Sequence, residues 1–390
     1  MDNKVDILTT WPIHFHPYVD LRDSELLALV ARVEALAGMT NSIPLPPTLR
    51  IRLDRLNILR AVRGTTGLEG SDLSIDEVGR VLDTPGQELV LGQSRRREEQ
   101  EVRNAQRVMR FIRNELHADP GRMLSEEDVR EIHRLTTAGI DYPNNVPGEY
   151  RAVPVVAGSY RAPEPSEVPD LMERFFEWFP TSVLGAEGEE WPESIRAVAA
   201  HFYMISIHPF GDGNGRTSRG VESYVLYRSG INSLGFYSLA NFYYVNRNEY
   251  VEMLNRARFV HNGDLTEFAK FSLGGLRDEL ELVHREALQA LKEIAFRDYA
   301  RETIQADNGL RTKTGERRLQ LVQLILREPA SVAALRSGRA LASALYIDVT
   351  PKTLTRDLNY LTRETDLLVI EDGEVRANLE AMNQFMDERD

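Results

Sequence analysis

The twelve residues from 208 to 219, HPFGDGNGRTSR, supply groups suited to binding a polyphosphate. Gly211, Gly213 and Gly215 carry no Cβ, so consecutive backbone N–H groups can turn toward one anion. A helical pattern of apolar residues starts near Gly215, and the first turn of a helix adds free N–H groups and the positive end of its dipole. The glycine spacing therefore predicts a phosphate site at a helix N-terminus.

The charged side chains of this segment add the groups that phosphate chemistry needs. Arg216 and Arg219 are three residues apart, so they share a helix face and can make forked contacts with phosphate oxygens. Asp212 offers the hard oxygen ligand that holds Mg²⁺ beside phosphates. His208 is the side chain whose ordinary pKa lets it accept a proton near neutrality. A lone His-Pro or Gly-Asp-Gly-Asn is typical of a turn, but this combination and order indicate a reaction site.

This segment resembles the signature of the Fic family, HPFx[DE]GNGRxxR, at every defining position. Most members of that family transfer AMP from ATP to a hydroxyl side chain of a target protein. The resemblance implies that His208 deprotonates the attacking Ser, Thr or Tyr hydroxyl and that Phe210 anchors the loop in the core. It also implies that Asp212 binds Mg²⁺ between the α- and β-phosphates.

The resemblance assigns the remaining residues to the nucleotide. Gly213, Asn214 and Gly215 would cradle the phosphates, with the Asn214 amide helping to orient them. Arg216 would hold the β-phosphate and Arg219 the γ-phosphate. Tyr250 and Leu254, four residues apart on one helix face, would close over the adenine; such a pair is also typical of a plain helix core.

Residues 65–70, TTGLEG, match the pattern [ST]xxxE[GN] of the inhibitory helix found in many Fic proteins, at Thr65, Glu69 and Gly70. A carboxylate beside Arg219 would form an ion pair and occupy the place of the γ-phosphate. ATP would then bind with its α-phosphate out of line, and a misplacement on the order of 1 Å can lower a rate about 100-fold. The hydroxyl of Thr65 would help to fix this helix. The resemblance also implies a possible second role, in which the same glutamate aligns a water that removes AMP from a modified target.

The rest of the chain must position these groups, and helical periodicity dominates it. Amphipathic patterns predict helices near 23–36, 48–62, 94–116, 125–138, 193–207, 247–260 and 265–283. Gly64, Gly67 and Gly70 are expected to weaken and end the second of these helices.

One β-rich segment, 149–161, predicts an isolated hairpin around Gly158-Ser159. In the resembled family a hairpin at this place is a flap that aligns the target's backbone by strand addition, here with Val153, Val155 and Val156. A surface hairpin without such a role is the alternative.

The C-terminal part indicates a second module. Asp307-Asn308-Gly309 marks a break, and three helical stretches near 317–326, 337–345 and 351–363 follow it. Two short strands around Asp372-Gly373 complete the pattern of a winged helix-turn-helix. Residues 311–378 hold eleven Lys and Arg against nine Asp and Glu, so DNA binding is possible but protein contact or dimerisation is favoured.

Composition limits the class of protein. The chain has 390 residues, 42% of them hydrophobic and 27% charged, which is typical of a globular protein with more than one domain. It has no cysteine, so disulfides and thiolate metal sites are excluded. No signal-peptide pattern or membrane-length apolar run is found, and we expect a cytoplasmic protein without a membrane partner. The net charge of −13 argues against the whole chain covering nucleic acid.

We therefore expect a mainly α protein: a Fic-type helical bundle with a β-hairpin flap and a C-terminal winged helix-turn-helix. The expected function is adenylylation of a target protein, and of the chain itself, using Mg²⁺ and ATP, restrained by Glu69. The alternatives are a DNA-binding regulator whose Fic domain senses a nucleotide, and a Fic transferase that moves UMP, phosphate or phosphocholine. The expected parts are an N-terminal helical region with the inhibitory helix near 50–70, the catalytic core, a linker, the winged helix and a tail, at 1–93, 94–290, 291–315, 316–378 and 379–390.

Overall fold

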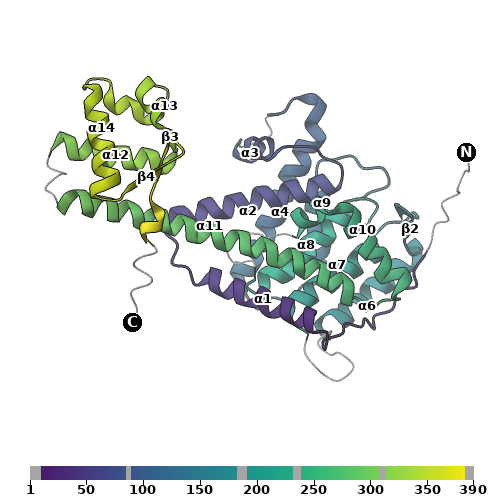
Figure 1. The fold of residues 1–390 in the computed structure, drawn as a ribbon. Coiled ribbons are helices and arrows are strands. Elements are labelled where there is room, and N and C mark those ends of the chain that lie inside the picture. The colour runs from purple at the N-terminus through teal and green to yellow at the C-terminus, as the bar shows by residue number, and fades with distance from the viewer. Residues whose placement is uncertain (1–9, 85–88, 182–190, 232–238, 307–311, 383–390) are drawn as a thin grey trace, which may run out of the picture. The chain divides into compact units, whose positions relative to one another are not determined.

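A computed structural model describes residues 10–84, 89–181, 191–231, 239–306 and 312–382. The chain divides into two compact units, Met1–Arg285 and Glu286–Asp390, and each is described by itself (Figure 1). The predicted break at Asp307-Asn308-Gly309 lies outside the described residues. Within the described part, no helix combines the length and the apolar character that crossing a membrane requires.

The first unit is almost entirely helical, as predicted. Its α-helices are α1 Ser24–Asn41, α2 Pro47–Leu68, α3 Ile75–Asp83, α4 Arg96–Ala118, α5 Glu126–Thr137, α6 Val168–Thr181, α7 Glu193–Ile207, α8 Asn214–Arg228, α9 Ala240–Val245, α10 Arg247–Asn255 and the first part of α11 Thr266–Ala306. Two 3₁₀ turns, Gln93–Arg95 and Pro165–Glu167, and a π-helical segment, Arg256–Val260, complete the helical elements.

Helices α7 and α8 form the centre of this unit. Nearly every residue of both is buried, and α8 contacts α2, α4, α5 and α7. A helix that is buried on every side lies in the core, and its position is set by the helices packed around it. The loop between α7 and α8 carries residues 208–213, so the densest part of the core supports the predicted reaction site.

The glycines of α2 do not end this helix where the sequence suggested. The helix continues through Gly64 and Gly67 to Leu68, and Gly70 follows with φ of +103°. A Cβ on Gly64 would lie 2.5 Å from the backbone nitrogen of Asn241, and one on Gly67 would lie 2.5 Å from the ring of Tyr244. These glycines therefore allow α2 to pack closely on α9.

The predicted hairpin is present with two very short strands, β1 Val156–Ala157 and β2 Tyr160–Arg161. They pair antiparallel, with Ala157 opposite Tyr160, and Gly158 turns the chain with φ of +62°. The hydroxyl of Tyr160 donates a hydrogen bond to the carbonyl of Ser206 in α7, at 2.7 Å. This contact fixes the hairpin to the helix that ends at His208.

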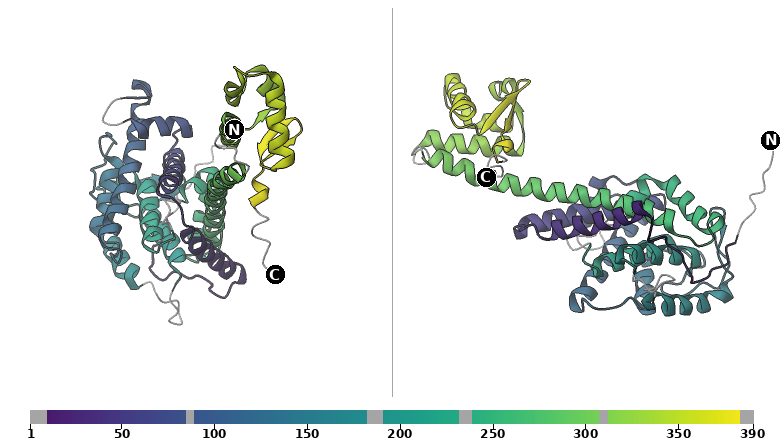
Figure 2. Two further views of the ribbon diagram at one scale, coloured as in Figure 1. Left: turned by 90° about the vertical axis from the view of Figure 1, so that its left-hand side faces the viewer. Right: turned by 60° about the horizontal axis from the view of Figure 1, so that its bottom comes forward.

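The second unit combines helices with a small sheet. Its elements are the end of α11, α12 Lys313–Arg327, β3 Ala330–Ser331, α13 Val332–Ser337, the 3₁₀ segment Leu341–Tyr346, α14 Pro351–Asn359, the π-helical segment Tyr360–Glu364, β4 Leu368–Glu371, β5 Glu374–Ala377 and a 3₁₀ turn at Leu379–Met382. The strands form an antiparallel sheet in the order β3-β5-β4, and β5 contacts α12. Figure 2 shows the helices of this unit in green and its last strands in yellow from two further sides. Asp372 and Gly373 both have positive φ, as the predicted hairpin turn requires.

Two predictions about this region are wrong. The linker expected over 291–315 is helical up to Ala306, because α11 continues through it, and α12 already begins at Lys313. The helix expected over 337–345 is instead α13 at 332–337 followed by a 3₁₀ segment. Gly338, with φ of +79°, separates the two. The assignment of this unit to the winged helix-turn-helix class stays a prediction.

Candidate active site

His208 directly follows α7 in an unusual backbone conformation. Its φ of 53° and ψ of 56° lie in the left-handed region, which costs a residue with a Cβ on the order of 1 kcal/mol or more. The surroundings hold it there: its N–H donates to the carbonyl of Met204, and its carbonyl accepts a 2.8 Å hydrogen bond from Nε of Arg151. This conformation ends α7 and begins the loop to α8, and His208 lines the cleft described below.

The ring of His208 is prepared to accept a proton. Its Nδ1 lies 3.1 Å from the carbonyl oxygen of Ile205. A carbonyl only accepts, so Nδ1 carries the hydrogen and Nε2 keeps a free lone pair. Burial lowers the pKa of His208 to about 4, and the positive charges of Arg258 and Arg151 act in the same direction. The imidazole is therefore a neutral base at pH 7.

Arg151 was not predicted from the sequence, yet it joins the flap to the catalytic loop. Besides the bond to His208, its Nη1 donates to the carbonyl of Val153 and its Nη2 to that of Pro163. Its own N–H donates to the carbonyl of Pro209. Arg151 is 4% exposed. Each of its three guanidinium nitrogens thus donates to a carbonyl, so this cation orders the backbone around the catalytic loop.

His133 of α5 packs against the loop that follows His208. It is a second residue of the site that was not predicted from the sequence. The ring of Phe210 is fully buried and stacks on the ring of His133, with centroids 3.7 Å apart. The N–H of Gly148 donates to Nδ1 of His133, so the other nitrogen, Nε2, donates to the carbonyl of Asp212. Burial lowers the pKa of His133 to about 4, which keeps this arrangement neutral. The predicted anchoring role of Phe210 matches this packing.

Asn214 closes the loop through its side chain. Its Oδ1 accepts a hydrogen bond from the N–H of Phe210, and its Nδ2 donates to the carbonyl of the same residue, both at 2.9 Å. Both polar atoms of the amide thus contact the loop, and the role of this amide in orienting the phosphates stays a prediction. Asn214 acts on the phosphate cradle by fixing the backbone.

The glycines of the motif are needed for space and for conformation. A Cβ on Gly211 would lie 2.2 Å from the carbonyl oxygen of Asn144. Gly213 has φ of +73° and caps α8. The N–H groups that begin α8 are thereby left open toward the cleft.

Arg216, the predicted β-phosphate ligand, is held by three oxygens. Its Nη1 donates to the hydroxyl of Tyr142 at 2.6 Å and lies 3.1 Å from a carboxylate oxygen of Glu101, and its Nη2 donates to Oδ1 of Asp212. Glu101 and Tyr142 come from distant parts of the chain, so no local pattern indicated them. This buried network fixes the position of the arginine.

Arg219, the predicted γ-phosphate ligand, contacts both residues of the predicted inhibitory motif. Its Nε donates to the hydroxyl of Thr65 at 2.9 Å, and its Nη2 lies 2.7 Å from Oε1 of Glu69. Burial raises the pKa of Glu69, but the charges of Arg219 and Arg216 more than offset this, so its pKa lies below the ordinary value. Gly215 leaves room for the pair, because a Cβ there would lie 2.5 Å from Oε1 of Glu69.

A cleft of about 760 Å³ joins most of the predicted residues, but Thr65 and Arg216 are not part of its lining and line a smaller cavity instead. The lining of the cleft includes Glu69, the flap residues Val155 and Val156, the motif residues His208, Asp212, Gly213, Asn214, Gly215 and Arg219, and the predicted adenine residues Tyr250 and Leu254. Val153 contributes its carbonyl to Arg151 and is not part of the lining. The structure thus places the flap and the predicted adenine pocket around one space.

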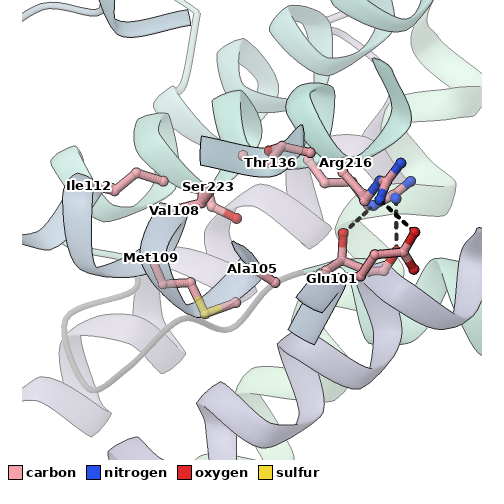
Figure 3. Close-up of a pocket in the computed structure, with 11 residues that line it drawn as sticks. Glu101, Ala105, Val108, Met109, Ile112, Thr136, Arg216 and Ser223 are labelled. Carbon is pink, nitrogen blue, oxygen red and sulfur yellow. Dashed lines mark hydrogen bonds and ion pairs between the residues drawn. The ribbon is translucent and has the colours of Figure 1, made fainter. Parts of the chain in front are cut away.

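A much smaller cavity of about 30 Å³ lies behind the two arginines (Figure 3). Its polar end carries Arg216 and Glu101, joined by the ion pair drawn in the figure, and its apolar end carries Ala105, Val108, Met109 and Ile112. This volume is enough for about one water molecule. The cavity is therefore too small for a nucleotide, and its lining residues support the two arginines.

Under the cleft lies a buried pair that the sequence did not reveal, His201 of α7 and Glu222 of α8. The Nδ1 of His201 is 3.7 Å from Oε1 of Glu222, and its Nε2 is 2.9 Å from the hydroxyl of Tyr250. Tyr243 donates a hydrogen bond to Glu222. Burial raises the pKa of Glu222 to about 8 and holds that of His201 well below its ordinary value. At neutral pH both groups are uncharged.

The residues present fit a magnesium ion only together with a nucleotide. Asp212 lines the cleft with its carboxylate about one-third exposed. Among the residues that the structure describes, no three His, Asp or Glu side chains gather to hold a metal. Mg²⁺ in phosphate-transfer sites needs only one or two carboxylates, because phosphates and water supply its other ligands. Asp212 satisfies that requirement.

Comparison with known proteins places this geometry in context. Residues 123–226 match the Fic/DOC family. The chain is similar to the protein adenylyltransferase Fic of Culex quinquefasciatus, with 28% identity over 221 residues, 56% of this chain and 40% of the relative. The protein of the same name from Nematostella vectensis is 25% identical over 211 residues, 53% of this chain and 44% of that one. The chain thus spans less than half the length of these curated relatives.

Two solved structures share the fold. A Fic family protein from Desulfovibrio desulfuricans superposes with a TM-score of 0.55 at 22% identity, over 93% of this chain and 98% of that one. Fic-1 of C. elegans, residues 134–508, superposes with a TM-score of 0.56 at 24% identity, over 69% of this chain and 74% of that one.

Proposed function

Because the chain carries a Fic domain, as its match to the Fic/DOC family and its fold show, we propose that it is a protein adenylyltransferase that moves AMP from ATP to a Ser, Thr or Tyr hydroxyl of a target protein. The family predicted from residues 208–219 is thereby confirmed. The observation that carries the proposed activity is the neutral ring of His208, whose Nε2 has a free lone pair beside an open phosphate cradle. The curated relatives named adenylyltransferase support the choice of AMP as the transferred group.

In the proposed reaction His208 takes the proton of the target hydroxyl at Nε2. The hydroxyl oxygen forms a bond to the α-phosphorus, the bond from that phosphorus to the bridging oxygen breaks, and pyrophosphate leaves. The tautomer held by Ile205 supplies the base without a preceding proton transfer. The flap residues Val155 and Val156 line the same cleft and would align the target's backbone.

The phosphates of ATP would lie along the start of α8. The backbone of Gly213, Asn214 and Gly215 would cradle them, and Arg216 and Arg219 would bind the β- and γ-phosphates. Asp212 would hold Mg²⁺, which when bound neutralises charge on the α- and β-phosphates. Tyr250 and Leu254 line the cleft where the adenine would lie.

We further propose that Glu69 restrains this reaction. Its carboxylate is a third exposed in the cleft and pairs with the arginine that the γ-phosphate needs. A triphosphate must displace this ion pair or bind in a shifted position, and the second outcome moves the α-phosphorus away from His208. The contact of Thr65 with the same guanidinium strengthens the inhibited arrangement.

DNA binding by the second unit receives less support. Arg317 and Arg318 of α12 both donate to Asp357, a carboxylate of α14 that is 1% exposed. These two cations are therefore committed within the unit. Lys352 and Arg356 lie on α14, and the hairpin at 371–374 of the same unit carries Glu371, Asp372 and Glu374, which phosphate would repel.

The test uses ATP labelled on the α-phosphate, with Mg²⁺, in the Glu69→Gly protein. We expect strong self-labelling, weak labelling of the unchanged chain, and none when His208→Ala is added. His117→Ala, at an exposed position of α4, is the matched control and should label like its parent. No label above background in Glu69→Gly would contradict the proposal. A parallel assay uses ATP labelled on the γ-phosphate, and label transferred only from that position would indicate a phosphate transferase. Salt-dependent DNA binding without any label transfer would favour the regulator.

A further inference from the structure

Two cations of the cleft, Arg247 and Arg258, have no task in the proposed mechanism, and of these Arg258 is buried whereas Arg247 is exposed. Arg258 lies in the π-helical segment after α10, four residues beyond Leu254 and eight beyond Tyr250. All three side chains line the cleft. The guanidinium of Arg258 therefore follows the two predicted adenine residues along the same wall of the cleft.

The guanidinium of Arg258 is buried without a carboxylate. The residue is 4% exposed, and its Nε donates to Oγ of Ser206 at 3.0 Å. Its Cζ lies 4.1 Å from the ring centroid of Tyr160. No Asp or Glu within the described residues forms an ion pair with it. Arg216 and Arg219, by contrast, each pair with a carboxylate. A buried charge without a counter-ion is costly, so its retention indicates an anion that arrives with a ligand.

Arg258 lies close in structure to the predicted base. Its Nε donates to Oγ of Ser206, two residues before His208, and both Arg258 and His208 line the cleft. The charge of Arg258 lowers the pKa of His208, as that of Arg151 does. Each guanidinium nitrogen of Arg151 donates to a carbonyl, whereas only Nε of Arg258 makes a hydrogen bond within the described residues. The two terminal nitrogens of Arg258 can therefore bind an anion.

We propose that Arg258 is a third phosphate-binding arginine, which contacts a non-bridging oxygen of the α-phosphoryl group during its transfer. This inference rests on the proposed adenylyltransferase function and extends it. As the hydroxyl oxygen attacks, negative charge gathers on the non-bridging oxygens of that group, and a fixed cation at this point stabilises it. Arg216 and Arg219 then bind the leaving pyrophosphate, while Arg258 binds the phosphoryl group of the AMP that is transferred to the target.

The experiment compares AMP with adenosine, because AMP carries the α-phosphate alone and adenosine carries none. Binding is measured by calorimetry in Glu69→Gly and in the same protein with Arg258→Met. We expect AMP affinity to fall about tenfold or more, as for loss of a charged hydrogen bond, with adenosine affinity unchanged. Arg219→Met is the matched control: it should leave AMP binding unchanged and weaken ATP binding.

Two further variants separate this role from support of the flap. Arg258→Lys keeps the charge and should recover part of the AMP affinity and of kcat. Tyr160→Leu removes the stacked ring but not the cation, and should keep the preference for AMP over adenosine. Thermal unfolding of each variant reports on the fold.

Three results would overturn the inference. They are an unchanged AMP affinity in Arg258→Met, an equal loss for AMP and adenosine, and a Tyr160→Leu protein that loses AMP binding as Arg258→Met does. If the parent protein binds neither ATP nor AMP, the proposed function itself fails, and this inference with it. That result differs from the others because it appears before any arginine is changed.

Discussion

Oε1 of Glu69 lies 2.7 Å from Nη2 of Arg219, although the two residues are 150 positions apart in the chain. The pair joins the end of α2 to the second turn of α8. Arg219 is 3% exposed and donates to Thr65 as well, so it is held from two sides. The arginine expected to select a triphosphate is thus already occupied by the protein.

The ion pair predicts how the protein distinguishes ATP from ADP. The unchanged chain should bind both with similar affinity, because Glu69 prevents the γ-phosphate from gaining the arginine. Glu69→Gly should bind ATP roughly 10-fold or more tightly than ADP, since a charged hydrogen bond contributes about 1.5–3 kcal/mol. Titration calorimetry measures both ratios. Adding Arg219→Met should return the ratio to about one, and a wild-type chain that already prefers ATP strongly would contradict the restraint.

Close packing of α2 on α9 predicts that an added methyl group loosens the same restraint. Gly64→Ala places a Cβ 2.5 Å from the backbone nitrogen of Asn241, which cannot move as a flexible side chain can. We expect the free energy of unfolding to fall by about 1–3 kcal/mol and self-labelling to rise. Denaturant unfolding and α-label transfer check the two effects.

The control for this change is Gly38→Ala in α1, where an added Cβ meets no atom within 4 Å. It should raise stability by up to about 1 kcal/mol and leave labelling unchanged. Equal stability of Gly64→Ala and the unchanged chain would show that α2 tolerates a wider spacing.

The lowered pKa of His208 predicts the pH dependence of transfer. The imidazole must be neutral to act as a base, and its pKa is about 4 in the folded protein. Initial rates of kcat/KM for Glu69→Gly should therefore change little from pH 8 to pH 6 and fall as pH approaches 4.

Stability must be followed alongside this rate. A His with a lowered pKa contributes stability above its unfolded pKa of roughly 6.5, and that stability is lost as pH falls toward the folded value. Circular dichroism at each pH separates the two effects. An acid limb centred near 6.5 in a folded protein would contradict the buried, neutral ring.

Glu222 predicts an opposite dependence of stability on pH. Burial raises its pKa from 4.5 to about 8, so its contribution is complete below the unfolded pKa and is lost as pH rises through the folded one. Glu222→Gln removes this loss. Its melting temperature should exceed that of the unchanged chain increasingly from pH 5.5 to 8.5, while exposed Glu252→Gln should change little. A constant difference at all pH values would show that Glu222 is ionised in the fold.

The sequence predicted the parts of the site that lie close together in the chain. Residues 208–219 form one loop and one helix start, so their spacing alone indicates their shared environment. The contact of Glu69 with Arg219 was predicted only through the resemblance to a family, since nothing in the spacing joins positions 69 and 219.

The supporting residues could not be predicted in this way. Arg151, His133, Glu101 and Arg258 lie on different elements, and each acts on the site only after the helices pack. Their types carry no local signal, because an arginine or a histidine on a helix is usually solvated or simply part of the core. The bonds of the Asn214 amide to the backbone of Phe210 were likewise not predicted from the motif.

Predictions of helix ends and linkers were wrong where tertiary packing outweighs local preference. Gly64 and Gly67 lower helix propensity, yet their missing side chains let α2 approach α9, and the contact keeps the helix intact. The polar stretch from 297 onward lacked a clear apolar period, although α11 continues through it to Ala306.

Glu69 is the residue directly after the last turn of α2, with its N–H bonded back to Thr66. The turn before it, from Thr65 to Leu68, is buried, whereas the side chain of Glu69 is 33% exposed. Withdrawal of the carboxylate from Arg219 therefore needs a movement at the residue after the helix, while the buried turn stays docked. An activator that binds this exposed carboxylate would act without disturbing the bundle.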